Sequence, residues 1–207
     1  FCGTQKFAPD KVFQAIEHFQ VTTLFLAPTM INMLVASDAK DDFDLSSLHT
    51  IIYGGGPMYT EHLLDAIHTF GPIFVQIFGQ GEAPMAITTL SSSQHHIDED
   101  DPSRQRLASA GRPVIGVRVS VVDENDKDVP IGNTGEIVVK SDLVMEGYWQ
   151  NDRATKEALR NGWLHTGDLG HLDSDGYLYI TDRKKDMIIS GGANIYPREV
   201  EEIIAAH

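Results

Sequence analysis

Short apolar runs alternate with amphipathic segments in the first part of the chain, and this alternation restricts the possible folds most strongly. The apolar runs are 21–26, 50–53 and 73–78. The segments before and between them repeat apolar residues at helical spacing, and Asp10 and Thr60 are expected helix N-caps. Strands joined through helices run parallel, because each helix crosses back along the sheet. The sequence therefore predicts an α/β unit with a mostly parallel sheet.

The pattern changes after this unit. Residues 91–106 are polar and include the acidic run 98–101, so we expect an exposed loop or linker. Beyond it, 117–122 and 136–140 alternate like strands on either side of a turn-rich stretch. This half predicts a small antiparallel β subdomain with the shape of a distorted barrel.

Composition excludes several classes of protein. The chain has 207 residues with 30 Asp and Glu against 16 Lys and Arg, a net charge of −14. Nucleic-acid binding needs a basic face, so nucleic acid is not an expected partner. The single cysteine, Cys2, allows no disulfide within the chain. No run approaches the ~20 apolar residues that span a bilayer.

The two ends of the sequence predict that it is a piece of a longer protein. It opens on Phe1 without a signal-peptide pattern and closes inside an amphipathic segment that follows Pro197. Together with the single cysteine, this favours a cytoplasmic location.

Two glycine-rich turns follow predicted strands. The turn at 54–57 lets backbone amides approach a ligand closely, although a plain strand-to-helix turn explains it better. In the second turn, at 76–82, Phe78 can stack on a base and Glu82 can ligate Mg²⁺. A surface glutamate on a glycine turn is an equally good interpretation of Glu82. Both turns lie where open α/β sheets bind ligands.

Two further motifs occupy the second half. Asp168 follows a glycine, and its ionised carboxylate can accept both hydroxyls of a ribose, or form an Asx-turn. Arg183 opens the basic cluster 183–185 and offers a planar fork of donors. The segment 182–186 is also interpretable as a solvated turn or as a hinge between subdomains.

The order of these motifs resembles the adenylate-forming superfamily of acyl-CoA synthetases, peptide-synthetase adenylation domains and beetle luciferases. The most specific pieces are 135–137 with 147–149, then 163–168, then 177–197. The chain is most similar to AMP-forming acyl-CoA synthetases, because 191–197 is similar to their glycine turn beside the pantetheine channel.

The resemblance implies an acid–thiol ligase that uses ATP, Mg²⁺ and coenzyme A. The family joins a carboxylic acid to ATP, which gives acyl-AMP and pyrophosphate, and a thiol then displaces AMP. It also implies four segments: an α/β subdomain over 1–100, a β-rich subdomain over 101–181, a hinge over 182–186, and the start of an α+β C-terminal domain over 187–207. The expected partners are a small carboxylic acid and coenzyme A.

The resemblance also implies roles for individual residues. Two of them carry catalytic roles, Glu82 as the Mg²⁺-associated carboxylate and Lys185 as the hinge. The others bind nucleotide or coenzyme A: Gly55, Gly56 and Pro57 at the acyl and adenine pockets; Gln76, Phe78, Gly79, Gln80 and Gly81 around the adenine and phosphate; Asp168 and Arg183 at the ribose; and Gly191, Gly192 and Asn194 in the C-terminal turn.

The chain departs from the family pattern in three places. Gly81 stands where the family usually has a threonine that contacts the adenylate phosphate. The family's phosphate loop and its C-terminal catalytic lysine find no match, so we expect this chain alone to make no acyl-AMP. A peptide-synthetase adenylation domain and a non-catalytic nucleotide-binding paralogue are the alternatives.

The histidines receive weaker interpretations. His95 and His96 beside the acidic run could ligate a metal, but a solvated loop is the favoured interpretation, since such a loop lacks fixed geometry. His165 could act as a base, although the implied mechanism needs none there. His171 has no partner that the sequence identifies.

Glycine in place of the usual threonine weakens the phosphate contact or shifts it to backbone amides, so we expect Gly81→Thr in the intact enzyme to leave adenylate binding undiminished. Calorimetric titration of the variant measures this, and a clear loss of affinity would contradict it.

Overall fold

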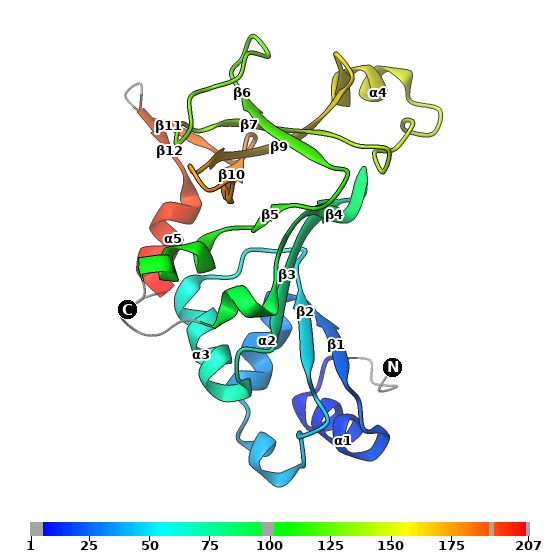
Figure 1. The fold of residues 1–207 in the computed structure, drawn as a ribbon, viewed down its shortest axis with the longest axis vertical. Coiled ribbons are helices and arrows are strands. Elements are labelled where there is room, and N and C mark those ends of the chain that lie inside the picture. Colours follow the sequence, from blue (N-terminus) through cyan, green and yellow to red (C-terminus); the bar gives the residue numbers. More distant parts are fainter. Residues whose placement is uncertain (1–5, 97–101, 191–192, 206–207) are drawn as a thin grey trace.

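The computed structural model describes residues 6–96, 102–190 and 193–205 and contains two large sheets, one above the other along the longest axis (Figure 1). The first sheet belongs to the N-terminal half and the second to the β-rich half. The α/β class with a following antiparallel unit, predicted from the sequence, is confirmed.

The first sheet has the strand order β1-β2-β3-β4-β5. Its strands are β1 (Thr23–Leu26), β2 (Thr50–Tyr53), β3 (Phe74–Gln80), β4 (Ala83–Leu90) and β5 (Arg112–Pro113). The pairs β1–β2 and β2–β3 are parallel, as predicted, whereas β3–β4 and β4–β5 are antiparallel. The sheet is therefore mixed, because the two-residue turn between Gln80 and Ala83 sends the chain straight back, and so short a connection allows only antiparallel pairing.

Three helices accompany the parallel strands: α1 (Pro9–Phe19), α2 (Pro28–Val35) and α3 (Thr60–Phe70). The predicted N-caps are wrong by one or two residues. Ala8 precedes α1 and Tyr59 precedes α3, both extended and without a side-chain cap. Pro9 starts α1 early because its fixed φ suits the first helical position.

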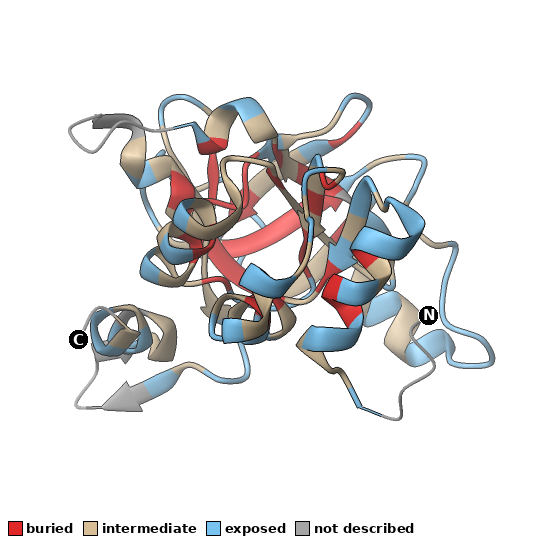
Figure 2. Cartoon of the chain, turned by 90° about the horizontal axis from the view of Figure 1, so that it is seen from below, coloured by how far each residue is buried: buried red, intermediate tan, exposed pale blue. Residues whose placement is uncertain are grey.

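The first hydrophobic core lies between these helices and the sheet. Its fully buried side chains include Phe13, Ile31, Ile51, Leu63 and Phe74. Seen from below, the buried segments are concentrated in the strands and the inward helix turns, and exposed segments lie around them (Figure 2).

The segment after β4 is more ordered than an exposed linker. It forms two 3₁₀ helices, Ser92–His95 and Pro102–Ala108, and His95 is completely buried. The expectation of a solvated loop is wrong at His95, because both ring nitrogens have partners inside the protein. Nδ1 lies 2.8 Å from the carbonyl oxygen of Ser91, and Nε2 lies 3.1 Å from the hydroxyl of Tyr53. The acidic run 98–101 lies outside the described residues.

The second sheet is antiparallel, as predicted, in the order β10-β9-β7-β6. Its strands are β6 (Arg118–Val122), β7 (Gly135–Lys140), β9 (Trp163–Leu172) and β10 (Leu178–Arg183), and the short β8 (Leu159–Arg160) pairs with β9. As described, these strands form an open sheet with β10 and β6 at its edges. Helix α4 (Asp152–Ala158), which the sequence analysis did not predict, follows β7 and is N-capped by the side chain of Asn151.

The C-terminal part contains β11 (Ile188–Ser190), β12 (Ala193–Ile195) and α5 (Pro197–Ala205). The strand after 187 and the helix that Pro197 opens were both predicted. Helix α5 lies beside α3 (Figure 1), where Glu201 accepts a hydrogen bond from the Tyr59 hydroxyl and Glu202 accepts one from the Thr60 backbone N–H. No helix among the described residues has the length and apolar character needed to cross a membrane.

Gly79 carries a testable consequence of the tight β3–β4 hairpin. A Cβ at this position would collide with backbone atoms of Met85 and Ala83, which cannot rotate away. We expect Gly79→Ala to lower the free energy of unfolding by about 2 kcal/mol, measured by urea denaturation.

Gly81→Ala is the matched control, because a Cβ there meets nothing within 4 Å and its φ is not positive. Equal stability of the two variants would contradict the proposed close approach.

Candidate functional site

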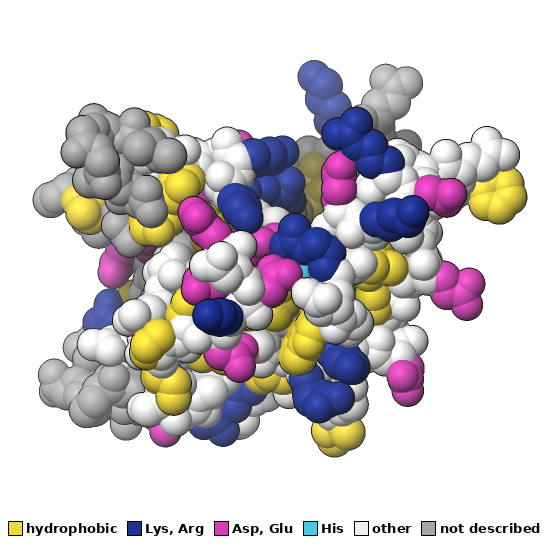
Figure 3. All heavy atoms as spheres, turned by 90° about the horizontal axis from the view of Figure 1, so that it is seen from above, with side chains coloured by type: hydrophobic (Ala, Val, Ile, Leu, Met, Phe, Trp, Pro, Cys, Tyr) yellow, Lys and Arg dark blue, Asp and Glu magenta, His cyan; other side chains and the backbone are white. Residues whose placement is uncertain are grey.

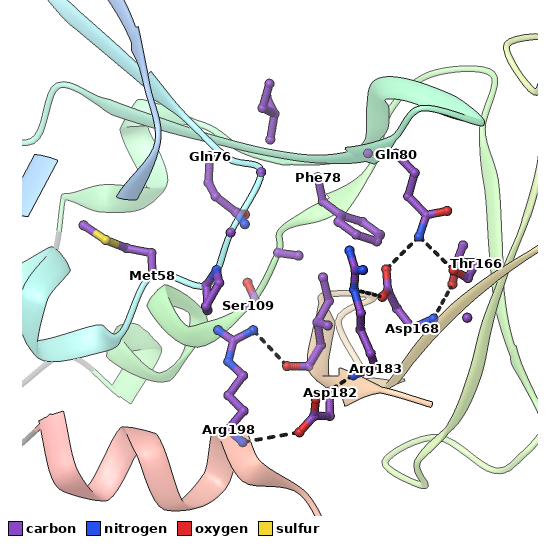
Figure 4. A pocket seen from close by; sticks show the side chains of 18 of the residues that line it. Met58, Gln76, Phe78, Gln80, Ser109, Thr166, Asp168, Asp182, Arg183 and Arg198 are labelled. Atoms are coloured by element: carbon purple, nitrogen blue, oxygen red, sulfur yellow. Dashed lines mark hydrogen bonds and ion pairs between the residues drawn. The ribbon is translucent and has the colours of Figure 1, made fainter. Parts of the chain in front are cut away.

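A pocket of about 880 Å³ opens where the carboxyl ends of β2 and β3 face the second sheet and α5. Residues 55–58 and 76–82 line one side, residues 166–168, 180 and 182–186 line the other, and Arg198 and Glu201 of α5 complete it. In Figure 4, Gln80 reaches Asp168, which also contacts Arg183, and Phe78 and Gln76 lie farther back along β3. Two sheets that are distant along the chain therefore share one cavity.

Most of the residues singled out in the sequence lie on this pocket. Its lining includes Gly55, Gly56, Pro57, Gln76, Phe78, Gly79, Gln80, Gly81, Glu82, Asp168, Arg183 and Lys185. Asn194 pairs through its backbone with Ile189 in the β11–β12 hairpin, and its side chain lies outside the described part of the structure. Gly191 and Gly192 lie outside the described residues.

The sequence analysis missed some of the lining. Ser109 and its neighbours Leu107, Ala108 and Ala110 carry no chemical signal of their own. Arg198 and Glu201 reach the pocket only because α5 packs beside α3. The only local signal for Arg198 was its position directly after Pro197, the residue that starts α5.

Asp168 is the buried anionic group of the pocket. Only 6% of the residue is exposed. Its Oδ2 accepts a hydrogen bond from Gln80 Nε2 at 2.9 Å, and its Oδ1 lies 3.5 Å from Arg183 Nε. Burial raises the pKa of Asp168, while the Gln80 hydrogen bond and the Arg183 charge oppose that rise. The carboxylate is thus held by two donors on the wall of the cavity.

Gln80 connects the two sheets. Its Nε2 donates both to Asp168 and to the carbonyl oxygen of Thr166, the latter at 2.8 Å. Both protons of this amide nitrogen are therefore used within the protein, and β3 is tied to β9. The side chain holds the site together, and the direct role in binding that the sequence analysis gave it remains a prediction.

Gln76 presents an unused acceptor. Its Oε1 is buried and has no hydrogen-bond partner among the described residues. An unsatisfied buried acceptor costs about 1–3 kcal/mol, so a ligand N–H donor in the pocket would be bound favourably there.

Glu82 lies at the tip of the β3–β4 hairpin. Its Oε1 accepts a hydrogen bond from the Tyr148 hydroxyl at 2.5 Å, and this bond raises the pKa of Tyr148 to about 12. No group of three or more His, Cys, Asp or Glu residues that could hold a metal ion occurs in the described part of the chain. A divalent cation at Glu82 would therefore draw its other ligands from the bound molecule, which is how Mg²⁺ commonly binds beside phosphates.

A cluster of charges supports the turn after β10. Lys184 Nζ lies 3.2 Å from the buried carboxylate of Glu136, and His165 Nδ1 lies 3.4 Å from the same carboxylate. Burial raises the pKa of Glu136, but Lys184 and His165 outweigh it, so the net shift is downward. His165 thus lies within this charged cluster, where its Nδ1 is also 2.7 Å from the guanidinium of Arg160, while His171 stacks on Tyr179 at 5.0 Å.

The face of the molecule seen from above carries Lys and Arg side chains interspersed with Asp and Glu (Figure 3). Charges of both signs therefore lie close to one another among the described residues of this face.

The comparison with protein families decides the assignment. The sequence matches the AMP-binding enzymes over residues 2–149. The chain belongs to the AMP-binding enzyme family. The resemblance to adenylate-forming enzymes inferred from the motifs is confirmed.

The chain is similar to several curated ligases. It is 46% identical to the medium/long-chain-fatty-acid–CoA ligase FadD8 of Mycobacterium tuberculosis, an alignment that covers 98% of the chain and 34% of FadD8. It is 42% identical to feruloyl-CoA synthase of Amycolatopsis sp, covering 94% of the chain and 38% of that enzyme. The chain thus spans a little over a third of the length of these relatives.

Solved structures share the fold of this AMP-binding chain. The amide bond synthetase McbA from Marinactinospora thermotolerans is 37% identical with a TM-score of 0.90, over 99% of the chain and 40% of McbA. The O-succinylbenzoate coenzyme A synthetase MenE from Bacillus subtilis in complex with AMP is 33% identical with a TM-score of 0.83, over 99% of the chain and 40% of MenE.

The contact between Gln80 and Asp168 predicts a change in acid–base behaviour. Because the N–H of Gln80 favours the ionised carboxylate, Gln80→Leu should raise the pKa of Asp168 further above its ordinary value of 3.8. The pKa of Asp168 is higher in the folded protein than in the unfolded chain. Ionisation of Asp168 therefore lowers the stability of the fold as the pH rises from the unfolded-state pKa to the folded-state pKa, and Gln80→Leu widens this pH range.

A pH titration of the Asp168 side-chain carboxyl carbon by NMR measures this shift. Asp123 serves as the internal control, because its pKa is lowered by its own turn hydrogen bonds with Lys127 and Asn125. An unchanged or lower pKa of Asp168 in the variant would contradict the role of Gln80.

Proposed function

We propose that this chain is the nucleotide-binding part of an AMP-forming carboxylic acid–CoA ligase, and that its pocket binds the AMP portion of an acyl-adenylate. The observation that carries the proposal is the presence, on one pocket, of a buried carboxylate and an unpartnered buried amide oxygen. A nucleoside offers the complementary groups, which are two ribose hydroxyls and an exocyclic amine.

Adenine fits the side of the pocket formed by β3. The exocyclic amino group would donate to Gln76 Oε1, which has no other partner among the described residues. Phe78 lines the same side, and its ring offers a face on which a base can stack. The backbone of Gly55, Gly56 and Pro57 lines the pocket nearby without bulky side chains.

The ribose fits beside the paired side chains of Asp168 and Arg183. An ionised aspartate accepts from both hydroxyls, and its rigid hold by Gln80 means that little side-chain freedom is lost on binding. The guanidinium of Arg183 is largely exposed, with 61% of its side chain accessible, and so remains available to a ligand oxygen.

The first half-reaction joins the substrate carboxylate to the α-phosphorus of ATP, and the bond from that phosphorus to pyrophosphate breaks. Mg²⁺, when bound at Glu82, would neutralise charge on the phosphate oxygens. In the second half-reaction a thiol attacks the acyl carbon and AMP leaves. The protein supplies no covalent nucleophile, so its residues act by positioning and by electrostatic stabilisation.

Lys185 is the proposed hinge for the change between half-reactions, and it lies on the exposed turn 184–186 at the pocket rim. Gly191 and Gly192 are proposed to lie beside the path of coenzyme A, and Asn194 is proposed to contact the nucleotide or the active-site side of the C-terminal domain. The division of the chain at 100, 181 and 186 remains a prediction, as does a cytoplasmic location, which rests on the need for ATP and coenzyme A.

One observation supports a second acceptor chemistry. The similar structure McbA is an amide bond synthetase. The same acyl-adenylate could therefore pass its acyl group to an amine. Supplying the full-length protein with ATP, an acid and either coenzyme A or an amine distinguishes the two functions.

The proposal predicts that AMP binding depends on Asp168. Asp168→Ala removes the acceptor of both ribose hydroxyls, and calorimetric titration of AMP should show an affinity at least about tenfold lower than that of the wild type. Asp123→Ala, at an exposed turn, should bind AMP as the wild type does. Equal affinity of Asp168→Ala and wild type would contradict the proposed ribose contact.

A further inference from the structure

Glu82 occupies a position that its own hairpin does not hold in place. Gln80 pairs with Ala83, so Gly81 and Glu82 form the two-residue turn between β3 and β4. Gly81 is exposed and has no side chain, and a Cβ there would meet no atom within 4 Å. The residue that precedes Glu82 therefore gives it no anchor.

The loop after β7 supplies the missing anchor. The backbone N–H of Met145 donates to the Glu82 carbonyl oxygen at 2.8 Å. Three residues later, the hydroxyl of Tyr148 donates to Glu82 Oε1 at 2.5 Å. A short hydrogen bond to an ionised carboxylate is among the stronger ones in proteins, so this loop fixes both the backbone and the side chain of Glu82.

Tyr148 is itself held by α4. Its backbone N–H donates to Thr155 Oγ1 at 2.9 Å, and that hydroxyl donates to the carbonyl oxygen of Asn151 at 3.0 Å. The preceding residue, Gly147, passes so close to Thr155 that a Cβ would lie 2.8 Å from its Cγ2. The sequence analysis gave the motif at 147–149 no role. In the structure α4 holds this motif in place, and the Tyr148 hydroxyl of the motif contacts Glu82.

This support leaves one carboxylate oxygen available. Oε1 of Glu82 is occupied by Tyr148, and among the described residues Oε2 has neither a hydrogen-bond nor an ion-pair partner. We propose that Tyr148 is a positioning residue for Glu82, which fixes Oε1 so that Oε2 is presented to a divalent cation shared with the bound phosphates. The inference rests on the proposed function, in which Glu82 is the cation ligand.

A purely structural role does not explain Tyr148. The residue is 37% exposed and its neighbour Trp149 is 89% exposed, so neither ring belongs to a core. Its hydroxyl is the group that reaches Glu82. Tyr148→Phe therefore removes the interaction while it preserves the ring.

The test uses Mn²⁺ as the cation probe in the full-length protein. With ATP present, electron paramagnetic resonance counts unbound Mn²⁺, and Tyr148→Phe should weaken Mn²⁺ binding about fivefold, the effect of one lost hydrogen bond. ATP affinity in EDTA and the urea unfolding midpoint should be unchanged. Thr155→Val, which removes the acceptor of the Tyr148 N–H, should give a smaller loss in the same direction.

Tyr59→Phe is the matched control. It also removes a phenol-to-carboxylate hydrogen bond, at 2.9 Å to Glu201, but Glu201 is not a proposed cation ligand. Mn²⁺ affinity should change less than about twofold in this variant.

A double-mutant cycle separates this inference from the proposed function. In Glu82→Gln, Mn²⁺ binding should be weak, and adding Tyr148→Phe should have no further effect. If Glu82→Gln weakens binding while Tyr148→Phe leaves it unchanged or tightens it, the positioning role is overturned and the cation ligand stands. If the wild type binds no Mn²⁺ with ATP, or Glu82→Gln binds it normally, the cation site itself is overturned, and the positioning role with it.

Discussion

The carboxamide of Gln80 is the interaction on which the shape of the pocket depends. It spans from the last residue of β3 to Thr166 and Asp168 on β9, and so joins the two sheets, which also share a hydrophobic core. A carboxylate as buried as Asp168 needs donors to stay ionised. Gln80 and Arg183 provide them from two different strands. The same contacts that hold the sheets together therefore prepare the anionic group of the site.

The wall of the pocket that carries Asp168 and Arg183 is stabilised by polar contacts with neighbouring elements. The buried Glu136 accepts from the Gly167 N–H and pairs with Lys184, which fixes the turn after Arg183. In the same wall, the Arg198 side chain donates to the Ile180 carbonyl oxygen at 3.0 Å. The site is thus built from side chains whose neighbours limit their motion, which reduces the entropy lost when a ligand binds.

The sequence predicted the parallel strands, the glycine turns and most of the pocket residues, because each carries a local signal. Runs of β-branched residues followed by glycine mark where a parallel strand ends, and ligands gather at such ends. The strand 83–90 was not predicted because Pro84 lies near its start. In the structure the next residue, Met85, has a positive φ of 52°. A proline is typical of sheet edges and bulges, not of strand interiors.

Other features could not be predicted because they join residues that are far apart in the sequence. Tyr148 lies 66 positions from Glu82, and Arg198 reaches the pocket only through the packing of α5. The burial of His95 likewise depends on Tyr53, 42 positions earlier. Local periodicity carries no information about such distant pairs. The polar character of 91–106 predicted that this segment, His95 included, faces solvent.

The buried His95 has a consequence for the floor of the pocket. The Ser91 carbonyl oxygen can only accept, so the proton of the imidazole resides on Nδ1 and Nε2 is left as an acceptor. Tyr53 must then donate its single hydroxyl proton to Nε2. Tyr53 also lines the pocket, and its hydroxyl has no proton left to donate to a bound molecule. A main-chain carbonyl four residues before His95 thereby sets the hydrogen-bonding role of a tyrosine 38 positions away.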